Sequence, residues 1–134
     1  MPGKEMKTTI VLFALVTFLL LNCEVQKEEM GTRVEVMPID SIDLPDTVSA
    51  GQKITFDAVV STPNPCWRFH HFDISQNDKE VTIRAHAEYD GEPCQQVVST
   101  FEAMGSLAFA EPGIYTIKLE RPERGMLEQT VVVE

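Results

Sequence analysis

The sequence predicts one small all-β domain, a single antiparallel sandwich of seven or eight short strands preceded by a helical signal peptide. From residue 32 onward, apolar and polar side chains alternate with a period of two, which is typical of strands that bury one face. Proline, glycine and aspartate interrupt this alternation at short intervals, as they do between the strands of sandwiches. A length of 134 residues suits a single compact domain.

Eight segments carry the strand pattern. The first contains Pro38, which cannot donate a backbone hydrogen bond, so we expect an edge strand there. The segment 81–89 alternates most regularly and predicts one dry and one wet face, whereas 95–104 is irregular. The last two segments flank the turn-rich residues 121–125 and predict a hairpin. The expected strands span residues 33–39, 53–60, 66–74, 81–89, 95–104, 107–111, 114–120 and 127–133.

A tyrosine near the start of the penultimate expected strand favours a sandwich over a barrel. Pro112, Gly113 and Tyr115 follow Leu107 in a pattern that resembles the corner of immunoglobulin and fibronectin-type domains, where the tyrosine hydroxyl bonds back to the chain. No cysteine lies two positions after Tyr115 or within 53–60, so an antibody-type disulfide between the sheets is not expected. The resemblance therefore implies an immunoglobulin-like architecture only.

The N-terminus has the pattern of a secretion signal. Lys4 and Lys7 precede residues 8–21, an uncharged and mostly apolar stretch that is shorter than the roughly 20 residues of a spanning helix. This stretch ends in Leu-Leu-Asn-Cys at Cys23, which resembles the lipobox of bacterial lipoproteins. The resemblance implies a diacylglycerol on Cys23, and attachment by several acyl chains would be effectively permanent.

The resemblance divides the chain into a signal peptide (1–22), a polar tether (23–31) and the sandwich (32–134). Asn22 departs from the small residue that usually precedes the lipidated cysteine. We expect a cell-envelope protein, anchored most readily in the outer membrane and either periplasmic or surface-exposed. An ordinary signal peptide with an incidental cysteine, or an uncleaved anchor, is the alternative.

The charge of the mature chain excludes one class of partner. The first 22 residues hold two lysines and one glutamate, which leaves nine basic and twenty acidic side chains and a net charge of about −11. Such a surface repels nucleic-acid phosphates and anionic lipid headgroups. We therefore expect no nucleic-acid partner.

The other two cysteines, Cys66 and Cys94, are expected to pair, because the remaining thiols of an exported protein usually form a disulfide. By the chain-entropy model, a loop of this size contributes roughly 3 to 4 kcal/mol.

No motif of a phosphate loop, metalloprotease, serine hydrolase or redox pair is present, so we expect neither catalysis nor a cofactor. The spaced aspartates of one loop are interpreted as solvated turn residues, and two adjacent histidines on a strand point to opposite faces, so we expect no metal site. These residues are Asp40, Asp43 and Asp46, and His70, His71 and His86.

The strand pair 66–74 and 81–89 carries the candidate binding face. A hairpin turn at residues 77 and 78 buries Phe72 and Ile74 and leaves aromatic and charged side chains outward, a combination that binding surfaces favour. This candidate face consists of Trp67, Phe69, His71, Arg84 and His86. The alternative is a one-residue shift or a bulge that turns Trp67 into the core.

Two functions remain open. The first is a non-catalytic binding or assembly module on a lipid tether, with a protein or glycan partner. The second is a protease inhibitor or enzyme accessory that uses the proline-stiffened loop 62–65. The identity of the partner and the oligomeric state are not specified by the sequence.

Overall fold

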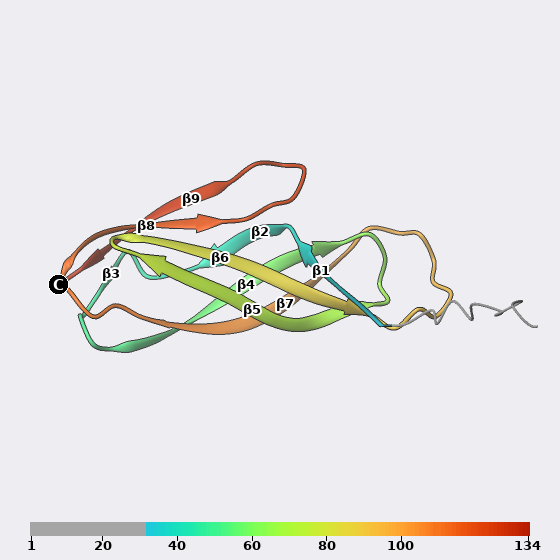
Figure 1. Ribbon diagram of the computed structural model, residues 1–134, viewed down its shortest axis with the longest axis horizontal. Coiled ribbons are helices and arrows are strands. Elements are labelled where there is room, and N and C mark those ends of the chain that lie inside the picture. The colour runs from blue at the N-terminus through green and yellow to red at the C-terminus, as the bar shows by residue number, and fades with distance from the viewer. Residues whose placement is uncertain (1–31) are drawn as a thin grey trace, which may run out of the picture.

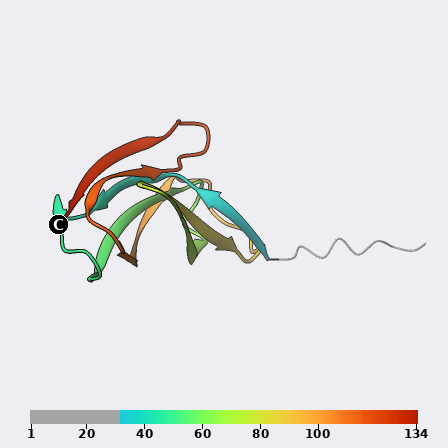
Figure 2. The same ribbon diagram turned by 60° about the vertical axis from the view of Figure 1, so that its left-hand side comes forward.

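A computed structural model describes residues 32–134 as a two-layer β-sandwich (Figures 1 and 2), which confirms the expected all-β fold. The expected signal peptide, Cys23 and the tether lie outside the described residues. Within the described part, no helix is long and apolar enough to span a membrane. The strands are β1 (Arg33–Met37), β2 (Ile39–Asp43), β3 (Thr47–Val48), β4 (Lys53–Thr62), β5 (Trp67–Asn77), β6 (Glu80–Tyr89), β7 (Ser99–Ala108), β8 (Gly113–Leu119) and β9 (Leu127–Val133).

The larger sheet has six strands and the smaller has three. In the larger sheet β6 pairs with β5 along one edge and with β1 and β8 along the other, and β8 continues through β9 to β3. The smaller sheet has the order β2-β4-β7. Most neighbours are antiparallel, as expected, but β6–β8 and β3–β9 are parallel.

The structure has nine strands where seven or eight were expected. Pro38 divides the expected first strand into β1 and β2, which belong to different sheets, because proline cannot donate to a ladder. A two-residue strand, β3, pairs with β9 and lies between the first two expected strands, 33–39 and 53–60. The expected segments 95–104 and 107–111 merge into the single strand β7.

The core lies between the two sheets and is entirely apolar at its centre. Phe56 on β4 is 1% exposed, and its ring fills the space beside Gly105 on β7. A Cβ at Gly105 would lie 2.3 Å from the Phe56 ring, so this position accepts only glycine without a shift of the ring. The other large, fully buried side chains are Phe109, Ile39, Ile83, Ile117, Leu119, Val60, Val81 and Val131.

The corner before β8 forms the bond that the sequence resemblance implies. Tyr115 is 3% exposed, and its hydroxyl donates a hydrogen bond of 2.8 Å to the carbonyl oxygen of Glu111. Gly113 has a φ of 151°, which L-residues rarely adopt, so glycine is required where the chain turns. The Tyr115 ring also packs against Phe109, with ring centroids 4.6 Å apart.

The β5–β6 hairpin turns one residue later than expected and pairs in a shifted register. Asn77 pairs with Glu80, so the turn residues are 78 and 79. Ile74 lies opposite Ile83, two positions from the expected partner, Val81. Because side chains alternate with a period of two, this shift leaves the dry face of β6 unchanged. Val81 and Ile83 are fully buried, as expected.

Candidate functional site

The candidate binding face on β5 does not form as the sequence analysis expected. Trp67 is 6% exposed, and its ring stacks on Tyr89 of β6 with centroids 5.3 Å apart. Phe69 is half-buried and lies 4.8 Å from Phe72 between ring centroids. The expected outward orientation of Trp67 and Phe69 is therefore wrong, and the alternative in which Trp67 turns into the core is confirmed.

A β-bulge explains this reversal. The pairing of β5 with β6 shifts between Phe69 and His71, so His70 is inserted into the strand and the side-chain alternation restarts after it. Trp67 and Phe69 before the bulge, and Phe72 after it, consequently lie on the same side. The sequence carries a signal for the bulge, since the apolar residues step by two from Trp67 to Phe69 but by three from Phe69 to Phe72.

The other members of the candidate face remain on the outer surface of β5 and β6. The rings of His71 and His86 stack with centroids 4.3 Å apart and an interplanar angle of 8°. Arg84 forms ion pairs with Glu120 and, at 3.7 Å, with Asp73. The structure thus brings His71, Arg84 and His86 together without the aromatic anchors that were expected beside them.

The bulge also places the chain's three histidines in one cluster. His70 Nδ1 lies 2.5 Å from His71 Nδ1, and His71 in turn stacks on His86. Burial is the largest cause of a lowered pKa at His86, the His71 ring adds to it, and Asp73 opposes it. His86 Nε2 is buried and has no hydrogen-bond partner among the described residues. No group of three or more potential ligands in the described part of the chain could hold a metal ion.

A solvent-open depression lies where β1, β4 and the β8–β9 loop meet. Its volume is about 470 Å³. At its border Asp40 accepts a hydrogen bond from Ser61 and pairs with Arg124, whose Nη1 lies 2.8 Å from Oδ1 of Asp40. We call this depression the loop hollow; its lining residues are Glu35, Val36, Met37, Pro38, Ser61, Thr62, Pro63, Val98, Pro122, Glu123 and Arg124.

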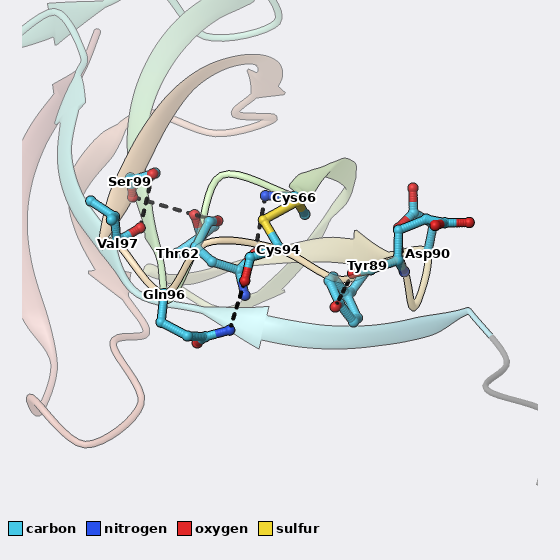
Figure 3. The surroundings of a disulfide bond; sticks show 10 residues. Thr62, Cys66, Tyr89, Asp90, Cys94, Gln96, Val97 and Ser99 are labelled. Carbon is cyan, nitrogen blue, oxygen red and sulfur yellow. Dashed lines mark hydrogen bonds between the residues drawn. A yellow bond between two sulfur atoms is a disulfide. The ribbon is translucent and has the colours of Figure 1, made fainter.

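The predicted Cys66–Cys94 disulfide is formed, with the two Cα atoms 6.1 Å apart (Figure 3). It ties the loop after β4 to the loop before β7. The first of these loops is further fixed by Asn64, whose side-chain oxygen accepts a 3.0 Å hydrogen bond from the Cys66 amide and whose carbonyl accepts one of 2.9 Å from the Thr62 hydroxyl. Both Thr62 and Asn64 are buried, so this loop presents mainly its prolines to solvent.

The second loop exposes two adjacent valines beside the loop hollow. Val97 and Val98 are 58% and 72% exposed, and only Val98 lines the hollow. The hollow could not be predicted from the sequence, because its residues come from four segments that are far apart in the chain. Within each segment, the local sequence pattern does not differ from that of an ordinary strand or loop.

The family comparison covers the region that contains most of these features. Residues 56–133, from within β4 to the end of β9, match the model of the ORF11 beta-sandwich domain family. The matched range is more than half of the chain. Comparisons with curated proteins and with solved structures gave no match.

Proposed function

We propose that this chain, which belongs to the ORF11 beta-sandwich domain family, is a lipid-anchored cell-envelope protein whose domain binds a protein or glycan partner without catalysis. The lipobox-like motif at Cys23 supports the anchor. The proposed anchor does not depend on charge, in keeping with a mature chain whose acidity repels anionic headgroups.

The loop hollow is the observation that carries the binding proposal. Its lining combines prolines and Val98 with Arg124 and Ser61, which both bind the Asp40 carboxylate at the border of the hollow. Binding sites in proteins commonly join apolar lining with a few fixed polar groups in this way. The hollow therefore offers a partner an apolar contact surface next to one oriented charge pair.

The chemistry of the lining supports binding over catalysis. Nucleophilic catalysis needs an activated serine or cysteine with a base within hydrogen-bond reach. The hollow contains neither histidine nor cysteine, and the Ser61 hydroxyl donates to a carboxylate that is already engaged by Arg124. All three histidines of the chain lie on β5 and β6, away from the hollow lining.

The anchor is tested by Cys23→Ser. We expect the variant to move from the detergent phase to the aqueous phase in detergent partitioning, or to accumulate as an unlipidated precursor. Unchanged partitioning of the variant would falsify the lipoprotein proposal.

Binding is tested by capture from solubilised cell-envelope fractions with the full chain as bait. Val98→Asp places a charge in the hollow at a side chain that is 72% exposed, so the fold should tolerate it. The matched control is Val97→Asp, which changes a neighbouring valine that is 58% exposed and lies outside the lining. If Val98→Asp alone loses a captured partner, the hollow is supported as the binding site. If both variants capture the partner equally, the hollow is not the binding site.

Inhibition of a protease through the loop 62–65 is the second candidate. The disulfide and the Asn64 hydrogen bonds favour it, because a rigid loop loses little entropy on binding. Its exposed side chains, however, are those of Pro63 and Pro65, and neither can enter a deep specificity pocket as a long side chain does. A panel of proteases assayed with the intact chain tests this candidate directly.

A further inference from the structure

The outermost strands of the two sheets differ in how their unpaired edges are protected. An open edge invites another strand, and proteins prevent this with short strands, bulges, prolines or charges. β1 and β3 are short, with five and two residues, and β2 follows Pro38 and has an irregular register. β5 has the bulge at His70 and the charged residues Arg68 and Asp73.

Among the described residues, the edge of β7 has a single charge and none of the other protections. Its ten residues pair with β4 in an unbroken register, from Lys53 opposite Ala108 to Thr62 opposite Ser99. The strand contains no proline, and Glu102 is its only charged residue. Its outward-facing Met104 is 68% exposed, the highest exposure of any large hydrophobic residue within a strand of the described structure.

We propose that β7 is a dimerisation edge that pairs antiparallel with β7 of a second copy of this chain, about a twofold axis at Met104. Residues opposite each other in an antiparallel pair lie on the same face, which restricts the possible registers. With the axis at Met104, the two Met104 side chains meet on the outer face and Glu102 lies opposite Ser106. With the axis at Glu102, two carboxylates would be opposed, which destabilises a strand pair.

The inner face of the pair is compatible with the same register. Phe101 lies opposite Leu107 of the other copy, and Ala103 lies opposite Gly105. These inward positions are buried or half-buried within one copy, so pairing extends the core without placing a charge in it. β7 is therefore self-complementary on both faces.

The net negative charge of the chain does not oppose this contact strongly. Asp57 lies opposite Met104 on β4, so the two Asp57 residues of a dimer would be three strand spacings apart, about 14 Å. The two Glu102 side chains would be separated by four residues along the strands, about 13 Å. Both separations exceed the Debye length of about 8 Å at physiological ionic strength.

Cysteine cross-linking in the full-length chain tests this register. In Met104→Cys the two Cβ atoms would lie about 4.5–5.5 Å apart, close to the separation in a disulfide, so mild oxidation should give a covalent dimer. The matched control is Ser106→Cys, on the same face and strand, whose two copies would be about 13 Å apart. The unaltered chain shows how much dimer forms through Cys23. The same two variants, each combined with Cys23→Ser, separate dimerisation from lipid anchoring.

We expect a band of covalent dimer on a non-reducing gel for Met104→Cys and no such band for Ser106→Cys. Three results would overturn the proposal: no dimer with Met104→Cys, equal dimer with both variants, or a covalent product of Met104→Cys with a different protein. A second measurement uses Met104→Asp, which places two like charges on the axis. Light scattering in detergent should give the mass of two chains for the unaltered protein and one chain for Met104→Asp, and an unchanged mass would also overturn the proposal.

Discussion

Truncation of Trp67 tests the bulge that reorients β5. The side chain is 6% exposed, stacks on Tyr89 at 5.3 Å and lies 5.6 Å from the guanidinium carbon of Arg33. Trp67→Ala would leave a large cavity and remove the aromatic stack, and truncations of this kind cost about 3–5 kcal/mol. If the domain lies at the lower end of the usual range, at about 5 kcal/mol, this change would leave only about 0–2 kcal/mol of stability.

Urea denaturation followed by far-ultraviolet circular dichroism measures this loss. Fluorescence cannot serve, because Trp67 is the only tryptophan in the chain. The matched control is His71→Ala, which changes an exposed residue beyond the bulge on the same strand and should alter the free energy of unfolding by less than about 1 kcal/mol. Phe72→Ala should give an intermediate loss, since its half-buried ring contacts Phe56 edge-on at 5.1 Å. A loss below about 1 kcal/mol for Trp67→Ala would contradict its inward orientation and the bulge with it.

Three further predictions concern the tyrosine corner, the disulfide and the half-buried His86. Tyr115→Phe removes the 2.8 Å bond to the Glu111 carbonyl and should lower the free energy of unfolding by about 1 kcal/mol, measured by the same melts. Cys66→Ala and Cys94→Ala should each cost about 3–4 kcal/mol, and the double variant should add little, because all three remove the same bond; additive losses would be inconsistent with a single shared disulfide. Because burial lowers the pKa of His86 in the folded chain, unfolding takes up a proton as the pH falls below the usual value of 6.5. Stability should therefore decrease from pH 7.5 to pH 5.5, and His86→Gln should reduce this decrease; an identical pH dependence in the variant would refute the assignment.

The features that local sequence determines were predicted best. The alternation in β6, the β8–β9 hairpin and the tyrosine corner each depend on residues within a few positions of one another. The corner could be predicted because the hydroxyl of Tyr115 reaches back only four residues. The disulfide was predicted by a different route, since export and the count of remaining cysteines left one pairing.

The features that depend on tertiary packing were not predicted. Strand β3 pairs with the edge of β9, and its two residues, although both are β-branched, are too few to show a period-two pattern. The orientation of Trp67 depends on a bulge, whose one-residue insertion reverses every side chain before it relative to those after it. The three-residue step from Phe69 to Phe72 could have indicated this insertion, whereas period-two alternation assumes a regular strand.

The β7 edge and the loop hollow together define what kind of partner a dimer would favour. Val98, which lines the hollow, lies directly before β7, so the antiparallel register about Met104 would place the two Val98 residues twelve positions apart along the strands, or about 40 Å. A partner with a repeated binding site at that spacing, such as a polymeric glycan or an oligomeric protein, could occupy both hollows at once. The second binding step would then be intramolecular, and the overall affinity would exceed that of one hollow by a factor set by effective concentration. Met104→Asp should therefore weaken capture of a multivalent partner and leave capture of a monovalent partner unchanged. This difference would show that β7 acts through avidity and does not contribute to binding in each hollow.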